Sequence, residues 1–164
     1  MNYMKLMFLL IVAYANRNKD CVCQKIIHTP KLFDQYNKPI NWNNYNVIAI
    51  GNKQNHKINN DILHYLLTKF KILNNNICII ASIPSWISTY GSRILFRNSI
   101  KLIESKNPVF IDWNQNFANK NNISIFPTII IKTKLNNVEL SRISGILTKE
   151  KLEFFFQKLQ SEFI

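Results

Sequence analysis

The stretch ISIFPTIIIK, residues 123–132, decides the fold. Its proline is followed by residues 128–132, an apolar run rich in β-branched side chains that predicts a buried strand. Residues 138–143 come next after a polar turn and are predicted to form the second strand of a hairpin. The chain then closes on an amphipathic helix that Thr148 can cap; its apolar face contains Leu152, Phe155, Phe156, Leu159 and Phe163.

Upstream of this hairpin, apolar runs alternate with segments of helical spacing. Strands are predicted at residues 47–50, 77–81 and 108–113, helices at residues 59–70 and 88–105, and a short helix or loop at residues 114–122. Residues 31–36 lie between two prolines and are predicted to make one or two helical turns. Alternating elements followed by a closing hairpin indicate an α/β protein, with a central mixed β-sheet flanked by helices on both faces.

The later motifs resemble the thioredoxin superfamily over about residues 76–160. The similarity rests on DWNQN at residues 112–116, ISIFPT at residues 123–128 and SGILT at residues 144–148. The resemblance implies a thioredoxin-like fold in which Pro127 follows a cis peptide bond beside the active site. It also implies that the backbone before this proline is free to pair with an extended peptide. From the residues alone, Pro127 is also compatible with an ordinary trans start of a strand.

The usual redox motif of that superfamily is missing. Its members carry Trp-Cys-x-x-Cys where a helix begins after the second strand, and the helix N-terminus lowers the pKa of the first thiol. If Trp86 matches that tryptophan, Ile87 and Ser88 follow it and both cysteine positions are lost. The acidic residue that the superfamily buries in the preceding strand would fall near Ala81. The resemblance therefore implies a site for an extended segment of another protein, without the usual thiol chemistry, formed by Trp86, Ile87, Ser88, Phe126, Pro127 and Thr128.

Cysteine spacing leaves an enzymatic alternative open. Cys78 lies in an apolar strand and is expected to act as a small buried hydrophobic residue. Cys21 and Cys23 form a Cys-x-Cys pair, which can close a strained disulfide that is prone to exchange. These two are the candidate catalytic residues of a thiol-disulfide oxidoreductase. In the peroxiredoxin-like and TlpA-like branches of the superfamily, the cysteines also precede a strand and a helix that lead to the Pro-Thr step.

A more specific resemblance is to the TrbC-like pilin-assembly proteins of F-type conjugation systems. Those proteins are exported, lack the Cys-x-x-Cys pair and show a Ser-x-Pro step after a strand, similar to residues 82–84 here. A later pattern is also similar, formed by Asp112, Phe117, Ile123 and Pro127. The helix and strand between the motifs are shorter here. This resemblance implies a role in assembling a conjugative pilus or secretion apparatus.

The N-terminus is typical of a secretory signal. A short basic start precedes the apolar residues 6–12, and Ala13-Tyr14-Ala15 has the small-x-small pattern of a cleavage site. We predict a signal peptide at residues 1–15, a polar leader at residues 16–44 and a thioredoxin-like domain at residues 45–164. The protein is therefore expected to be exported, either periplasmic or secreted. No apolar run approaches the roughly 20 residues of a membrane helix, so no transmembrane span is expected after cleavage.

The net charge of +12 raises the possibility of nucleic-acid binding. The 17 Lys and 4 Arg are dispersed, with no run of five and no stripe interleaved with aromatic residues. Nucleic acid is therefore not expected as a partner. His28, His56 and His64 lack metal-ligand spacing, so no metal is expected, and no cofactor is expected either.

Overall fold

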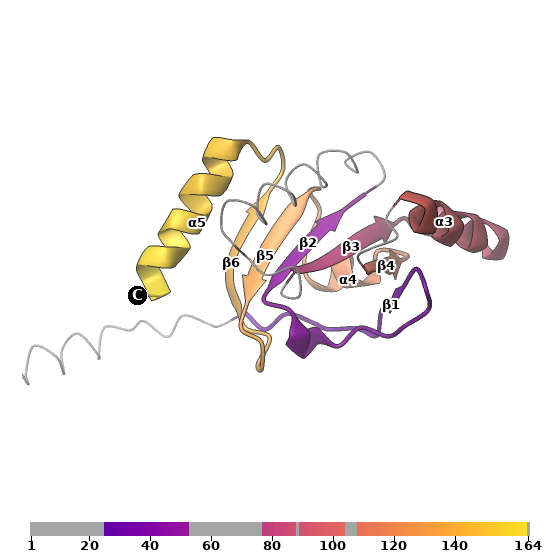
Figure 1. Cartoon of the computed structure of the whole chain (residues 1–164), viewed down its shortest axis with the longest axis horizontal. Coiled ribbons are helices and arrows are strands. Elements are labelled where there is room, and N and C mark those ends of the chain that lie inside the picture. Colours follow the sequence, from indigo (N-terminus) through magenta and orange to yellow (C-terminus); the bar gives the residue numbers. More distant parts are fainter. Residues whose placement is uncertain (1–24, 53–76, 88, 104–107, 164) are drawn as a thin grey trace, which may run out of the picture.

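The computed structural model describes residues 25–52, 77–87, 89–103 and 108–163. These residues form a mixed six-stranded sheet in the order β1-β4-β3-β2-β5-β6 (Figure 1). The strands are β1 (Phe33–Asp34), β2 (Val47–Gly51), β3 (Ile77–Ile83), β4 (Val109–Trp113), β5 (Thr128–Lys132) and β6 (Glu139–Ser144). The helices are α3 (Tyr90–Ile103), α4 (Asn116–Lys120) and α5 (Lys149–Phe163), with short 3-10 helices η1 (Trp42–Asn44) and η4 (Ser85–Ile87).

The direction of the strands changes in the middle of the sheet. β2, β3 and β4 run parallel to one another. β5 pairs antiparallel with β2 and with β6, and β1 pairs antiparallel with β4 at the far edge. The predicted mixed sheet and closing hairpin are both confirmed.

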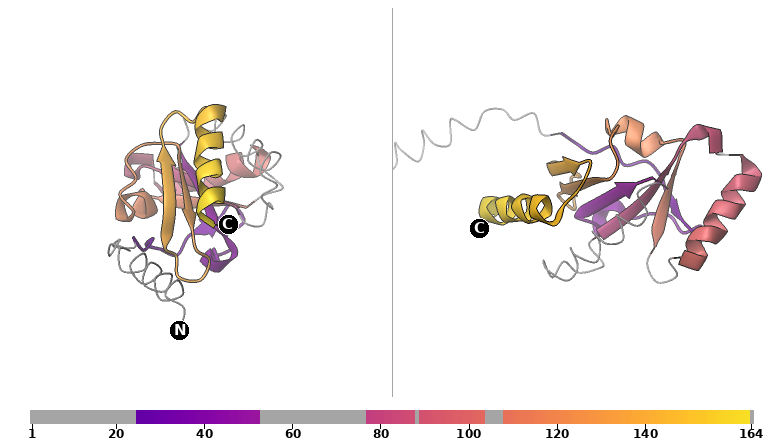
Figure 2. Two further views of the ribbon diagram at one scale, coloured as in Figure 1. Left: turned by 90° about the vertical axis from the view of Figure 1, so that its left-hand side faces the viewer. Right: turned by 90° about the horizontal axis from the view of Figure 1, so that it is seen from above.

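Helices cover both faces of the sheet, as predicted (Figure 2). Because side chains alternate along a strand, Phe110 of β4 lies on one face and Trp113 on the other. On the first face, the buried core joins the sheet to Phe117 of α4; it also includes Ile48, Ile50, Cys78, Ile80 and Ile130. On the second face, Phe96 of α3 makes an edge-to-face contact with Trp113, with ring centroids 5.9 Å apart.

The segment expected to be a polar leader is part of the packed domain. Ile27 and Leu32 are only 2% and 4% exposed and belong to the core cluster. The Trp42 ring stacks on that of Phe117, with centroids 5.2 Å apart, and its indole N–H donates to the Pro30 carbonyl at 3.0 Å. The domain thus includes residues 25–44 and begins before the predicted residue 45.

The predicted helical turns at residues 31–36 are wrong. Phe33 and Asp34 form β1, which pairs with Ile111 and Phe110 of β4. A turn follows, in which the Asp34 N–H donates to the Lys38 carbonyl at 2.9 Å. Pairing with the edge of β4 satisfies backbone groups that a single helical turn would leave open. The predicted signal peptide, Cys21, Cys23 and the helix predicted at residues 59–70 lie outside the described residues.

Candidate functional site

The loop that precedes β5 is fastened to the end of β6. Its Phe126–Pro127 peptide bond is cis, the isomer that the thioredoxin resemblance implies. The Pro127 carbonyl accepts a hydrogen bond from the Gly145 N–H at 2.9 Å. The Thr128 hydroxyl donates a hydrogen bond to the Ile125 carbonyl at 2.6 Å and is also hydrogen-bonded to the Ser144 hydroxyl at 2.7 Å. These bonds hold the loop in one position at the end of the sheet.

The surface of this loop is formed by Phe126. Pro127 and Thr128 are buried, whereas Phe126 is half-buried and packs one side against the core cluster. Within the described part of the chain, the backbone N–H and C=O of Phe126 make no hydrogen bond to another backbone group. What this loop can offer a partner is therefore the backbone of Phe126 and one side of its ring.

A shallow depression of about 410 Å³ lies beside Phe126. It is lined by Gln115, Asn119, Asn122, Ile123, Ser124 and Phe126. None of these side chains is ionisable, so the depression suits an uncharged side chain that can accept or donate a hydrogen bond.

The strand beside this loop is β2. Thr128 pairs with Ile50, so Pro127 lies next to the carboxyl end of β2. Trp86 and Ile87 follow β3, and β2 separates β3 from β5. The predicted site residues thus fall into two groups, with Phe126, Pro127 and Thr128 in one and Trp86 and Ile87 in the other; Ser88 lies outside the described residues.

This topology changes which part of the sequence corresponds to the redox motif. The segment that leaves the sheet beside Pro127 follows Gly51 and reads NKQNHK over residues 52–57, with no cysteine. β2 itself reads VIAIG and carries no acidic residue. The comparison of Trp86 with the motif tryptophan placed the motif after β3, whereas the strand that adjoins β5 is β2. The cysteine pair is missing in either alignment, because no cysteine lies between Cys23 and Cys78.

Cys78 is a core residue, as predicted. Its side chain is fully buried in β3, and burial raises its thiol pKa far above the usual range. Lys132, also fully buried, donates from its Nζ to the carbonyls of Trp42 at 2.9 Å and Thr133 at 3.2 Å. Burial lowers the pKa of Lys132. A buried thiol of raised pKa is a poor nucleophile, so Cys78 does not supply the missing chemistry.

Asp112 is the one buried carboxylate at the carboxyl ends of the described parallel strands, and it has a structural role. It accepts hydrogen bonds from the backbone N–H groups of Phe117 and Ala118 at the start of α4. Burial raises its pKa, and these hydrogen bonds oppose that rise. Ser82 lies opposite Asp112 on β3. Its hydroxyl group also opposes the rise in the pKa of Asp112, although the hydroxyl oxygen has no regular hydrogen-bond geometry with any described group.

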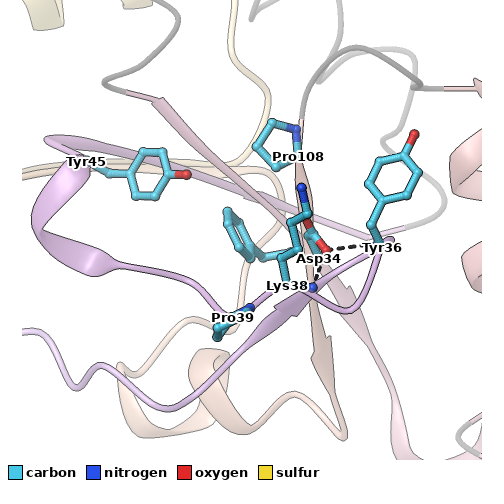
Figure 3. A pocket seen from close by; sticks show the side chains of 7 residues that line it. Asp34, Tyr36, Lys38, Pro39, Tyr45 and Pro108 are labelled. Atoms are coloured by element: carbon cyan, nitrogen blue, oxygen red, sulfur yellow. Dashed lines mark hydrogen bonds between the residues drawn. The ribbon is translucent and has the colours of Figure 1, made fainter.

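A second depression of about 340 Å³ lies beside β1, at the edge of the sheet (Figure 3). It is lined by Asp34, Tyr36, Lys38, Pro39, Tyr45, Pro108 and Phe110. Asp34 is its one carboxylate, and Oδ1 of Asp34 accepts the backbone N–H groups of Tyr36 at 2.9 Å and Lys38 at 2.7 Å. This oxygen therefore holds the turn after β1, and the other charged side chain of the lining is that of Lys38.

The sheet order, the hairpin and the loop before β5 together define a thioredoxin-like fold. No family model and no curated protein matches the chain. Solved structures do match: the exposed lipoprotein thioredoxin of Streptococcus pneumoniae has a TM-score of 0.57 at 16% identity, covering 79% of this chain and 98% of that one. A thiol-disulfide oxidoreductase from Bacteroides fragilis has a TM-score of 0.56 at 16% identity, and the match covers 82% of this chain and 99% of that one. A thio-disulfide isomerase from Thermus thermophilus has a TM-score of 0.57 at 11% identity, and the match covers 82% of this chain and 94% of that one.

These similarities confirm the predicted α/β thioredoxin-like fold. At such low identity they establish the fold alone. No helix among residues 25–52, 77–87, 89–103 and 108–163 has both the length and the apolar character needed to cross a membrane.

Proposed function

We propose that this protein is an exported thioredoxin-fold binding module that holds an extended segment of a partner protein at the Phe126–Pro127 loop. The observation that carries this proposal is that a backbone open to pairing and a segment without cysteine lie at the same end of the sheet. A firmly anchored loop offers the backbone of Phe126, which makes no hydrogen bond to another backbone group among the described residues. β2 beside it and residues 52–57 after β2 carry no cysteine.

Backbone pairing would supply the affinity for such a segment. An extended peptide beside Phe126 can exchange hydrogen bonds with its N–H and C=O in the manner of an added strand. Alternate side chains of that peptide would then face the domain. The depression beside Phe126 would favour an uncharged polar residue at one of these positions, because its lining contains four uncharged polar side chains.

The partner class we favour is a subunit of a pilus or secretion apparatus. The support is the resemblance to the TrbC-like pilin-assembly proteins, together with the predicted signal peptide. A module that holds an extended segment by its backbone, without forming or breaking disulfides, suits the assembly of such subunits.

Site-specific photo-crosslinking tests the binding site. A benzophenone analogue of phenylalanine at position 126 should yield an adduct in which the partner is attached through one short extended segment. The same label at Leu135, an exposed residue in the β5–β6 turn, is the control and should give no such adduct. Ser124→Glu should lower the adduct yield severalfold by placing a charge in the depression. Equal labelling from both positions would reject the site.

The second candidate is a thiol-disulfide oxidoreductase that uses Cys21 and Cys23. The carbonyl of Lys25 accepts the Glu139 N–H at 2.8 Å, at the hairpin end of β6. Pro127 lies at the other end of β5, roughly 17 Å away for five residues of strand. A cysteine pair serving Pro127 would therefore have to return along the length of the sheet.

An activity assay separates the two functions. Disulfide reductase and isomerase activity would be measured for the chain from Asn16 and for the same chain carrying Cys21→Ser and Cys23→Ser. The binding-module proposal expects no activity in either. Activity that disappears in the double variant would establish an oxidoreductase with a displaced cysteine pair.

A further inference from the structure

The depression beside β1 contains charged groups of both signs, and we call it the β1 depression. Asp34 and Lys38 line it on one side, and Tyr45 lies on the other with its hydroxyl directed toward them (Figure 3). Among the described residues, no ion pair joins the Asp34 carboxylate to the Lys38 ammonium. Two opposite charges that do not neutralise each other therefore border the same space.

The Asp34 carboxylate has one oxygen engaged in the fold and one open to the β1 depression. Asp34 is only 4% exposed, and its Oδ1 atom accepts the backbone N–H groups of Tyr36 and Lys38. Within the described part of the chain, Oδ2 accepts no hydrogen bond, and it is not one of the polar atoms sealed from solvent there. A charged oxygen in a buried residue gains from a donor, so Oδ2 suits an N–H group of a ligand.

Two groups in the β1 depression can donate to an anion. Neither the Lys38 ammonium nor the Tyr45 hydroxyl makes a hydrogen bond to a described residue. Burial raises the pKa of Tyr45, so its hydroxyl stays protonated and can donate. From α3, Lys101 adds positive charge on the same side, with its Nζ 5.8 Å from the centre of the Tyr36 ring. These donors suit a carboxylate.

The rest of the lining is apolar and rigid. The Tyr45 ring makes an edge-to-face contact with Phe110, with centroids 5.9 Å apart, and Pro39 and Pro108 complete the wall. Prolines lose no side-chain entropy when they are covered. The volume of about 340 Å³ lies at the lower end of the range for small-ligand sites, roughly 300 to 1,000 Å³. The β1 depression therefore has the size and the wall for one small molecule with an apolar group.

We propose that the β1 depression binds a free α-amino acid with a large apolar side chain. The ammonium group of the ligand would donate to Asp34 Oδ2, and its carboxylate would accept hydrogen bonds from Lys38 and Tyr45. Its side chain would lie against Phe110 and the two prolines. An α-amino acid carries both charges and the apolar group on one carbon atom, which matches this combination of lining groups.

The two charges select a free amino acid over a peptide. A peptide C-terminus lacks the ammonium group, and a peptide N-terminus lacks the carboxylate, so each would leave one charge of the β1 depression without a partner. The inference is independent of the proposed binding at Phe126. β1 and β5 are separated in the sheet by β4, β3 and β2, so either site can fail without the other.

NMR titrations of the full chain with L-phenylalanine and two analogues test the proposal. Hydrocinnamate lacks the ammonium group, and phenethylamine lacks the carboxylate. L-phenylalanine should shift the amide resonances of Tyr36 and Lys38 saturably, and each analogue should bind about tenfold more weakly, because it loses charge-assisted hydrogen bonds. No saturable shift, or an affinity for either analogue equal to that for L-phenylalanine, would overturn the proposal. So would shifts confined to Phe126 and its neighbours.

Two variants assign each charge of the ligand to its partner. Asp34→Asn keeps the Oδ1 acceptor that holds the turn after β1 but removes the negative charge. It should weaken L-phenylalanine binding about tenfold and leave hydrocinnamate binding no weaker. Lys38→Met should weaken both of these ligands and leave phenethylamine binding no weaker. An equal loss for all three ligands in either variant would overturn the proposal.

Lys31→Met is the matched control for Lys38→Met. Both lysines are exposed, so neither replacement disturbs the core, and both changes remove one positive charge. Lys31 lies just before β1, with its Nζ 5.2 Å from the centre of the Phe33 ring, and does not line the β1 depression. Lys31→Met should therefore retain the wild-type affinity for L-phenylalanine. Equal weakening by the two variants would show a general effect of net charge and overturn the proposal.

Discussion

Asp112 Oδ1 lies 2.7 Å from the backbone nitrogen of Phe117, and Oδ2 of the same carboxylate lies 3.1 Å from that of Ala118. The first residues of α4 have no nearer cap, because Gln115 at the N-cap position makes no side-chain hydrogen bond there. A carboxylate at a helix N-terminus is favourable both as an acceptor and through the helix dipole. The end of β4 therefore holds α4, and with it the depression beside Phe126, in position.

Replacing Asp112 by alanine should destabilise the domain by roughly 3 kcal/mol. The change leaves two buried N–H groups without an acceptor. Chemical denaturation monitored by circular dichroism would measure the loss. Asn116→Ala, an exposed change in the same helix, is the control and should cost far less. A cost for Asp112→Ala no larger than this control would contradict the capping role.

The same carboxylate predicts a pH dependence. Burial raises the pKa of Asp112 above its ordinary value of 3.8, so the folded protein binds this proton more tightly than the unfolded chain. The contribution of Asp112 to the free energy of unfolding therefore falls as the pH rises from about 3.8 through the folded-state pKa, and is constant above it. The difference in stability between wild type and Asp112→Asn should shrink over that interval. A difference that grows with pH would mean that hydrogen bonding outweighs burial.

Asn121 should hold the N-terminal segment in the core. Its side-chain oxygen accepts the His28 N–H at 2.8 Å, and its amide nitrogen donates to the carbonyls of His28 and Phe117, both at 2.9 Å. Asn121→Asp cannot donate to those carbonyls and should cost roughly 2 to 3 kcal/mol. Hydrogen exchange at the His28 amide should accelerate with it. Asn119→Asp, an exposed change two residues away, should leave that exchange unchanged.

Two glycines predict substitutions of opposite sign. Gly145 has a φ of 88°, so Gly145→Ala should destabilise the fold by about 1 to 2 kcal/mol through backbone strain. The added Cβ itself would not clash, because the nearest atom would be Cγ2 of Ile125 at 3.7 Å. Gly91 lies in α3 with no atom near its added Cβ, so Gly91→Ala should stabilise by about 0.5 to 1 kcal/mol. Thermal unfolding of both variants measures the two changes in stability. Changes of the same sign in Gly145→Ala and Gly91→Ala would contradict this prediction.

Cys78 should react with thiol reagents only after unfolding. Burial excludes the reagent and raises the pKa, so the reactive thiolate is scarce. The measurement uses the variant with Cys21→Ser and Cys23→Ser, which leaves Cys78 as the one thiol in the chain. Rapid labelling under native conditions would show that β3 opens readily.

The elements formed by continuous apolar runs could be predicted from sequence. β5 was predicted at its observed bounds, and β2 and β4 within one residue at an end, because a strand covered on both faces needs uninterrupted apolar residues. The end of β3 was missed, since Ser82 is polar and its pairing with Asp112 is not a local property. Thr148 caps α5 as predicted, accepting the Lys151 N–H at 3.4 Å.

The candidate site was predicted only in part. The Pro127 loop could be found because its residues are contiguous and lead into a clear strand. Trp86 was grouped with it because it could match the motif tryptophan of the thioredoxin superfamily, but Trp86 follows β3, and β2 lies between β3 and β5. The contribution of Ile27 and Leu32 to the core was also missed, because two apolar residues in a polar segment have no periodicity to reveal them.

By itself, the sequence determined the α/β class, the order and approximate bounds of most elements, and the absence of a Cys-x-x-Cys pair, because these follow from composition and from spacing over a few residues. Only the tertiary structure decided that β2 lies between β3 and β5, and that residues 25–44 pack into the domain and contribute Ile27 and Leu32 to its core. Each depends on which distant segments pack together, and that choice is made by the burial of the whole chain rather than by any local pattern.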